Sequence, residues 1–263
     1  MSGRAPGPSR PAGRWRAARP RDKGFAVACC VVLAAYNNLI SRHPWHYRRY
    51  VPLNLGATGA ALAAAAAGGL TAADLGAGRG RWSPGRAGAG WSAATAAAWA
   101  LAVAAPAARP LLRDERVAGL DGRAAAYQAL VRIPLGTVLW EETAFRGVLQ
   151  AALRRVASES AAMAVTSGVF GIWHIRPTLQ ALRANGLADR PGRAAAGTAA
   201  GVAATIAAGL LLSRLRVRSG SLAAPVLLHL AANSGGVVAA WAVAYRARGR
   251  HDGGTARGGT VRG

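Results

Sequence analysis

Five ionisable side chains and one amide interrupt otherwise apolar stretches in the second half of the chain. They fall in three short motifs, LWEETAFRGVLQ, FGIWH and HLAAN. A charged side chain at the centre of a bilayer costs about 2.5–3.5 kcal/mol on insertion scales, so such groups usually face a cavity and have partners. The candidate site residues are Glu141, Glu142, Arg146, His174, His229 and Asn233.

The spacing inside these motifs places polar groups on defined helix faces. Glu142 and Arg146 are four residues apart and can pair on one face, whereas Glu141 points about 100° away from Glu142. His229 and Asn233 are also four residues apart, and the second motif ends in a histidine. Three helices that each carry one polar stripe can bring these stripes together around one internal cavity.

This set of groups could hydrolyse an amide bond. A carboxylate can deprotonate a bound water with the help of one histidine, and a second histidine and an asparagine can donate to the oxyanion of a tetrahedral intermediate. No GxSxG motif and no suitably placed cysteine supply a nucleophile. Two His and two Glu could instead hold Zn²⁺, but HExxH is absent. We therefore predict a metal-free site without a cofactor.

Simpler interpretations of single residues stay open. Glu142 and Arg146 could form a purely structural ion pair, because charges inside membranes are usually paired. One histidine on an apolar helix is more often a packing residue than a catalytic one. We interpret His43, His46 and His251, which lie in polar segments, as solvated. The catalytic interpretation rests on the three motifs together.

The elements that must position these groups are apolar runs separated by Arg-, Gly- and Pro-rich loops. Each run approaches the roughly 20 residues that cross a bilayer as a helix, and Pro134 should kink the fourth. The sequence predicts an all-α fold, a polytopic transmembrane bundle of about seven to eight helices. The runs are 24–40, 51–70, 91–108, 124–150, 160–175, 194–213 and 221–245.

Composition suggests four segments. We expect disordered basic tails at 1–23 and 246–263, N-terminal transmembrane helices and loops at 24–123, and a site-bearing transmembrane core at 124–245. The net charge of +23 could indicate nucleic-acid binding, but the basic residues lie between apolar runs and no such motif occurs. Arg-rich loops of a membrane protein explain them better, and the basic N-terminal tail favours a cytoplasmic N-terminus.

The three motifs, in this order, resemble those of the CPBP intramembrane protease family, also called the CAAX protease or abortive-infection family. EETAFRG resembles its EExxxR motif, FGIWH its FxxxH and HLAAN its HxxxN, and the resemblance covers 124–245. It implies a type II CAAX prenyl endopeptidase-like protein, an intramembrane glutamic endopeptidase. By analogy, Glu141 activates the water with His174 assisting, and His229 and Asn233 form the oxyanion site.

In this interpretation Glu142 and Arg146 support the site, and the partners are the lipid bilayer and a membrane-associated peptide or protein. The alternative is a non-catalytic scaffold or self-immunity protein of the same architecture. A transporter or proton relay is disfavoured, because the early helices are almost wholly apolar apart from Asn37, Asn38 and Asn54. The Ala/Gly/Arg bias indicates a GC-rich genome, so we expect a multi-pass protein of a bacterial plasma membrane.

Overall fold

Helices account for all regular structure in the part of the chain that the computed structural model describes, residues 19–78, 80 and 82–255. This confirms the all-α fold class. In chain order the elements are α1 (Pro20–Ala35), η1 (Tyr36–Ile40), α2 (Pro44–Arg48), α3 (Tyr50–Ala67), α4 (Gly85–Ala104), η2 (Arg109–Leu112), α5 (Glu115–Ala118), α6 (Gly122–Tyr127), η3 (Gln128–Val138), α7 (Leu139–Glu142), η4 (Thr143–Leu149), α8 (Gln150–Arg154), α9 (Glu159–Trp173), α10 (Ile175–Ala184), α11 (Pro191–Ser219) and α12 (Ala223–Thr255).

Five helices within the described residues are long and apolar enough to cross a membrane. Only 11–28% of the most apolar window of each is buried inside the protein, so apolar side chains face outward, as they do toward lipid. The chain is a polytopic membrane protein, but the count of seven to eight membrane helices is not confirmed. The five spans are Pro20–Ile40, Tyr50–Ala67, Gly85–Ala104, Pro191–Ser219 and Ala223–Arg248.

Two further apolar runs are helical but do not form long regular helices. The run 160–175 forms α9, which has 15 residues. The run 124–150 lies in a helical path from Gly122 to Arg154 that alternates between α- and π-helix. Neither therefore forms an uninterrupted α-helix of membrane-spanning length, which is why the two do not add to the five spans.

The π-helical segments flank the two carboxylates of the first motif. Pro134, where the sequence predicts a kink, lies inside η3, and the N–H of Leu139 donates to the carbonyl of Pro134 across a five-residue turn. The short helix α7 holds Glu141 and Glu142 between η3 and η4. Single π-turns inside α-helices often mark functional sites. The π-helical segments on both sides therefore make Glu141 and Glu142 candidates for a functional site.

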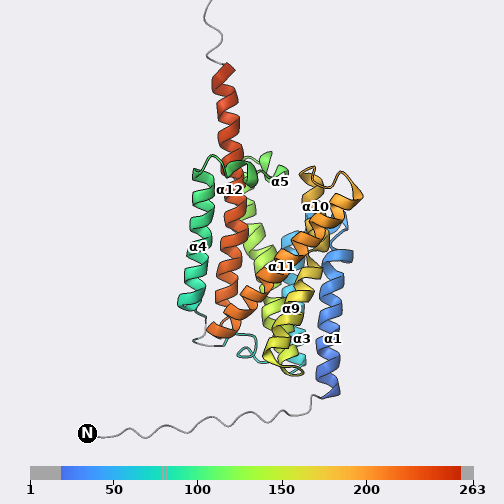
Figure 1. The fold of residues 1–263 in the computed structure, drawn as a ribbon. Helices are drawn as coiled ribbons and strands as arrows, with labels where there is room; N and C mark the ends of the chain where they lie inside the picture. Colours follow the sequence, from blue (N-terminus) through green and yellow to red (C-terminus); the bar gives the residue numbers. More distant parts are fainter. Residues whose placement is uncertain (1–18, 79, 81, 256–263) are drawn as a thin grey trace, which may run out of the picture.

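Close helix packing fixes the end of α9. Helix α9 packs against α11, which crosses it obliquely, while α12 packs against α4 (Figure 1). Gly171 of α9 faces Ile206, and Gly209 of α11 lies against Ser167. Small residues let helix backbones approach closely in membranes. The α9–α11 contact therefore sets the position of His174, which follows α9.

Replacing Gly171 by Val should destabilise the protein by about 1–3 kcal/mol more than the same change at Gly168, because overpacking a tight contact costs that much. A Cβ at Gly171 would overlap Ile206 and lie 3.3 Å from Val202 Cγ1, whereas a Cβ at Gly168 has no neighbour within 4 Å. Both changes lie in α9. Melting temperatures of the two variants in detergent provide the measurement, and equal values would contradict a tight α9–α11 contact.

The helices extend into both segments that the sequence predicts as tails. Helix α1 begins at Pro20, inside 1–23, and α12 continues to Thr255, well into 246–263. The rest of each tail lies outside the described residues. The start of α1 and the far end of α12 lie at opposite ends of the bundle (Figure 1). The boundary between the N-terminal helices and the site-bearing core stays a prediction.

Candidate active site

The structure brings all six predicted site residues together inside the bundle. They come from three separate parts of the chain: the path from α6 to α8, the end of α9, and α12. Four of the side chains are buried and two are partly exposed, so the group is not wholly enclosed. The buried residues are Glu141, Glu142, Arg146 and His229, and the partly exposed ones are His174 and Asn233.

A continuous hydrogen-bonded chain links the first motif to the third. Arg146 NH1 donates to Glu142 Oε1 at 3.0 Å, and His229 Nδ1 lies 2.7 Å from the same oxygen. A carboxylate beside a guanidinium only accepts hydrogen bonds, so His229 Nδ1 carries the hydrogen. His229 Nε2 then accepts from Asn233 Nδ2 at 3.0 Å. The Glu142–Arg146 pair thus orients His229 and is more than an isolated ion pair.

Glu141 occupies a different environment from its neighbour. Its Oε1 accepts a hydrogen bond from Trp173 Nε1 at 3.0 Å. Its Oε2 is buried and has no hydrogen-bond partner within the described structure. This oxygen lies 3.8 Å from His229 Nε2 and 4.0 Å from His174 Nε2. One carboxylate oxygen is therefore fixed, and the other faces two imidazoles across gaps too long for direct hydrogen bonds.

The backbone settles the tautomer of His174. Its Nδ1 lies 2.7 Å from the carbonyl oxygen of Phe170. A carbonyl only accepts, so Nδ1 carries the hydrogen and Nε2 presents a lone pair toward Glu141. The Phe170 ring packs against the His174 ring with centroids 4.4 Å apart, and the Arg146 guanidinium lies 4.1 Å from the Phe170 centroid. Phe170 thus separates the ion pair from His174.

Sequence reasoning missed Trp173, which precedes His174 and touches the carboxylate directly. Trp173 is 2% exposed, and its ring stacks on Tyr36 with centroids 5.6 Å apart and planes 2° apart. A buried indole N–H usually finds a hydrogen-bond acceptor. The available signal was a tryptophan directly before a candidate catalytic histidine, in an apolar helix that offers few acceptors.

Two asparagines of the first membrane helix hold the end of α9. Asn37 Nδ2 donates to the carbonyl of Trp173 at 3.0 Å, and Asn38 Nδ2 donates to that of Ile172 at 2.8 Å. Asn38 Oδ1 accepts from the backbone N–H of Arg176 at 3.2 Å. Carbonyls at a helix C-terminus lack partners within the helix, so these amides satisfy them and fix the chain beside His174.

Asn54 makes a similar link to η3, the segment just before the first motif. Its Nδ2 donates to the carbonyl of Gly136 at 2.7 Å, and its Oδ1 accepts from Tyr36 Oη at 2.9 Å. The same hydroxyl lies 3.3 Å from His46 Nε2. The prediction that His46 is solvated is wrong: it is 3% exposed, and burial lowers its pKa. Helix α2 folds this histidine against Tyr36, a contact that sequence spacing does not show.

The donor set does not fit a metal ion. Among the residues that the structure describes, no three His, Cys, Asp or Glu side chains are placed to hold one. Glu142 Oε1 and both nitrogens of His229 already have partners inside the protein, whereas a zinc site needs several free donors directed at one point. The absence of a cofactor stays a prediction.

The fold and the site together define a class: multi-pass helical membrane proteins with a buried carboxylate and two histidines. Residues 123–235 match the family model described as type II CAAX prenyl endopeptidase Rce1-like. This segment, which contains all six site residues, is a domain of the CAAX protease family, and the predicted resemblance is confirmed. No curated protein and no solved structure gives a significant match to the chain.

Proposed function

We propose that this protein is an intramembrane glutamic endopeptidase that cleaves a peptide bond with a water activated by Glu141 and His174. The observation that carries the proposal is Glu141 Oε2, a buried carboxylate oxygen that faces two imidazole nitrogens and has no hydrogen-bond partner among the residues that the structure describes. Buried polar atoms are normally satisfied, and exceptions call for an explanation such as a catalytic role or an unseen water. Membership of a protease family supports the same reaction class.

The gap between Glu141 Oε2 and His174 Nε2, 4.0 Å wide, suits a shared water, because polar groups farther apart than 3.5 Å are commonly bridged in this way. Both atoms accept, so the water donates one hydrogen to each. As its oxygen bonds to the carbonyl carbon of the substrate, the carbonyl electron pair moves to oxygen and Glu141 takes the proton. That proton passes to the leaving nitrogen when the C–N bond breaks.

The developing oxyanion needs donors, and Asn233 is the donor that the arrangement favours. One hydrogen of its amide is directed to His229 Nε2, and the other remains for the substrate oxygen. His229 Nε2 holds that amide in place, and His229 Nδ1 is in turn fixed at 2.7 Å by Glu142 Oε1. Glu142 and Arg146 thus act through His229, and fixed donors of this kind supply much of the catalysis of acyl transfer.

The substrate class follows from where the site lies. A site among membrane helices can act on a peptide or protein held in or at the bilayer, and no cofactor takes part. The composition favours the plasma membrane of a bacterium as the location.

A comparison of peptide termini tests the proposal. Membranes carrying the wild type or Glu141→Gln, at matched expression, are compared by mass spectrometry for new N- and C-termini. Termini that are present with the wild type and absent with the variant identify substrates and support proteolysis. Identical profiles, with both proteins folded and membrane proteins broadly covered, would overturn the proposal and favour a non-catalytic scaffold or self-immunity protein.

Trp173→Phe should lower kcat about tenfold or more and leave KM nearly unchanged, because a hydrogen bond to a charged group contributes about 1.5–3 kcal/mol. The Phe ring preserves packing against Tyr36 but no longer positions Glu141. The matched control is Trp140→Phe: Trp140 lies beside Trp173 and is buried, but within the described part of the chain its Nε1 has no hydrogen-bond partner. Kinetics on a substrate peptide check this, and equal losses in both variants would assign Trp173 to packing alone.

A further inference from the structure

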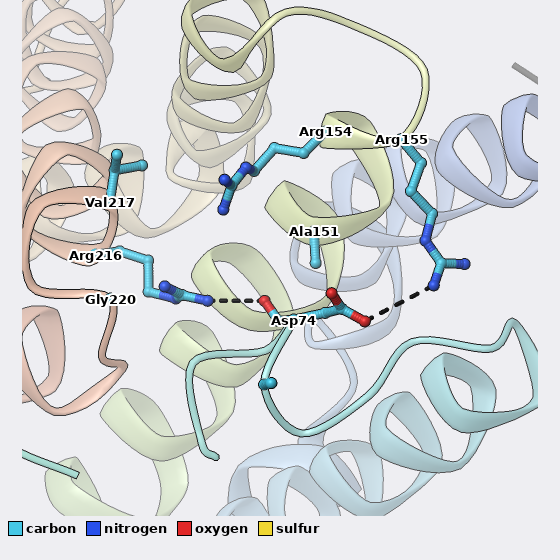
Figure 2. Close-up of a pocket in the computed structure, with 8 residues that line it drawn as sticks. Asp74, Ala151, Arg154, Arg155, Arg216, Val217 and Gly220 are labelled. Atoms are coloured by element: carbon cyan, nitrogen blue, oxygen red, sulfur yellow. Dashed lines mark hydrogen bonds and ion pairs between the residues drawn. The ribbon is translucent and has the colours of Figure 1, made fainter. Parts of the chain in front are cut away.

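A concave site separate from the candidate active site lies at the end of the bundle where α1 begins. It is a pocket of about 500 Å³, within the roughly 300–1,000 Å³ usual for ligand sites. Its wall carries three arginines and one aspartate and comes from the loop after α3 and from the ends of α8 and α11 (Figure 2). The charged lining residues are Asp74, Arg154, Arg155 and Arg216, and Gly220 lines the pocket at the end of α11.

The pocket lies where membrane helices end. Arg154 is the last residue of α8, Arg216 is in the last turn of α11, and Gly220 ends that helix with φ 66°. The loop that carries Asp74 follows the span Tyr50–Ala67. Because these spans end together on the side where α1 starts (Figure 1), the pocket lies at the level where lipid head groups meet the protein.

Two of the three arginines are held in place by backbone carbonyls. Arg155 donates to the carbonyls of Gly68 and Gly69, and its NH2 lies 3.8 Å from Asp74 Oδ2. Arg216 NH2 donates to the carbonyl of Asp74 at 2.7 Å, and Arg216 is 4% exposed. The loop between them is therefore braced from both sides, and the wall of the pocket is built before any ligand enters.

The third arginine is available to a ligand. The Arg154 side chain is 43% exposed and extends into the space between Arg155 and Arg216 (Figure 2). Its NH2 pairs with Glu159 Oε2 at 3.1 Å, and the Glu159 side chain is itself 46% exposed. Exposed pairs of this kind contribute about 0–1 kcal/mol, so a stronger anion can displace Glu159 at little cost.

The charge of the lining favours an anion. Three guanidinium groups face one carboxylate, Asp74. Burial acts to raise the pKa of Asp74, but hydrogen bonds from Thr71 and the nearby Arg155 and Arg154 lower it below its usual value. Asp74 thus stays ionised, and the lining itself carries three positive charges and one negative charge. Outside the lining, Asp22 lies 3.8 Å from Arg155 NH1 and Glu159 pairs with Arg154, so an anion is held chiefly by taking the place of Glu159 at Arg154. Guanidinium groups match the geometry of phosphate oxygens better than ammonium groups do.

We propose that this pocket binds a phosphate group, supplied by the head group of an anionic phospholipid, with Arg154 as the main exposed contact. The inference stands apart from the proteolytic site, because it uses other residues and does not depend on catalysis. A membrane-end pocket with a fixed basic wall and one movable arginine has the chemistry to hold such a head group. Basic pockets and clusters at membrane surfaces recognise anionic lipids in this way.

The full-length protein in a neutral detergent provides the test. Its melting temperature is followed while short-chain phosphatidylglycerol, short-chain phosphatidylcholine or inorganic phosphate is added, since a ligand of the folded state raises it. We expect phosphatidylglycerol to stabilise the wild type at the lowest concentration. In Arg154→Gln, the phosphatidylglycerol concentration that gives half of the maximal rise in melting temperature should be about fivefold higher or more, as expected for one lost basic contact.

Two control variants separate the pocket from general charge. Arg218→Gln removes an exposed positive charge from the same end of α11 without touching the pocket lining. Glu159→Gln breaks the ion pair but leaves Arg154 in place. Arg218→Gln should respond to phosphatidylglycerol as the wild type does, and Glu159→Gln at the same or a lower concentration, because the competing carboxylate is gone. If inorganic phosphate reproduces the Arg154-dependent effect at equal concentration, the lipid source is wrong. An equal lipid response in the wild type and Arg154→Gln, or an equal loss in Arg218→Gln, overturns the site.

Discussion

Glu141→Gln should lower the rate of peptide-bond cleavage about 10²–10⁴-fold, the usual contribution of a positioned general base. The glutamine keeps an oxygen that can accept from Trp173 Nε1, so the local hydrogen bond survives. Its amide nitrogen, placed where Glu141 Oε2 faces the two imidazoles, cannot take a proton from water. The expected result is a folded protein that binds substrate and turns it over very slowly, as measured by initial rates of the purified protein on a substrate peptide.

Two comparisons keep this prediction specific to the site. The melting temperature of Glu141→Gln should match that of the wild type, because no buried ion pair is broken. Glu115→Gln makes the same chemical change at an exposed residue outside the site and should leave the rate unchanged. A Glu141→Gln protein that cleaves at the wild-type rate would remove Glu141 from the role of base.

Arg146→Leu should have the largest effect on stability, a loss of about 3–5 kcal/mol, because it leaves a buried carboxylate without its counter-ion. Both side chains of the Glu142–Arg146 pair are fully buried. The substitution also removes the guanidinium from above the Phe170 ring. Unfolding of the purified protein in mixed micelles, followed by tryptophan fluorescence, measures the loss.

The double variant Glu142→Gln with Arg146→Leu shows whether the buried charge is the cause. With no carboxylate left, the penalty for an unpaired charge disappears, and the carbonyl oxygen of the introduced glutamine side chain can still accept from His229 Nδ1. The double variant should therefore be more stable than Arg146→Leu alone. If the two are equally unstable, packing of the arginine side chain, and not its charge, holds this part of the bundle together.

The fold class and the site set follow from local signals in the sequence. Long apolar runs predict membrane helices, and four-residue spacing places Glu142 with Arg146 and His229 with Asn233 on shared helix faces. In the structure, Arg146 donates a hydrogen bond to Glu142, and Asn233 donates one to His229. What each residue does in a reaction stays a prediction, since geometry alone does not measure turnover.

Other features depend on contacts between distant segments and could not be predicted. Nothing in the spacing of the motifs shows that Trp173 reaches Glu141, or that Asn37 and Asn38 reach the end of α9. Hydrophobicity predicts more membrane helices than the five long apolar spans, because it does not show that the helix around Glu141 alternates between α and π geometry. A polar flanking sequence likewise predicts a solvated His46, because it does not reveal the helix that buries this side chain.

Asparagines of the early helices bind the segment that carries the site, so the two parts of the protein cannot be expressed separately without loss of these contacts. Asn37, Asn38 and Asn54 all lie upstream of the matched segment 123–235, yet their amides cover backbone carbonyls on both sides of the site. The segment that carries the motifs is therefore not a self-sufficient module. Expressed alone, it would present those carbonyls to lipid, whereas co-expression of the first helices as a separate polypeptide should restore a complementary, split form of the protein.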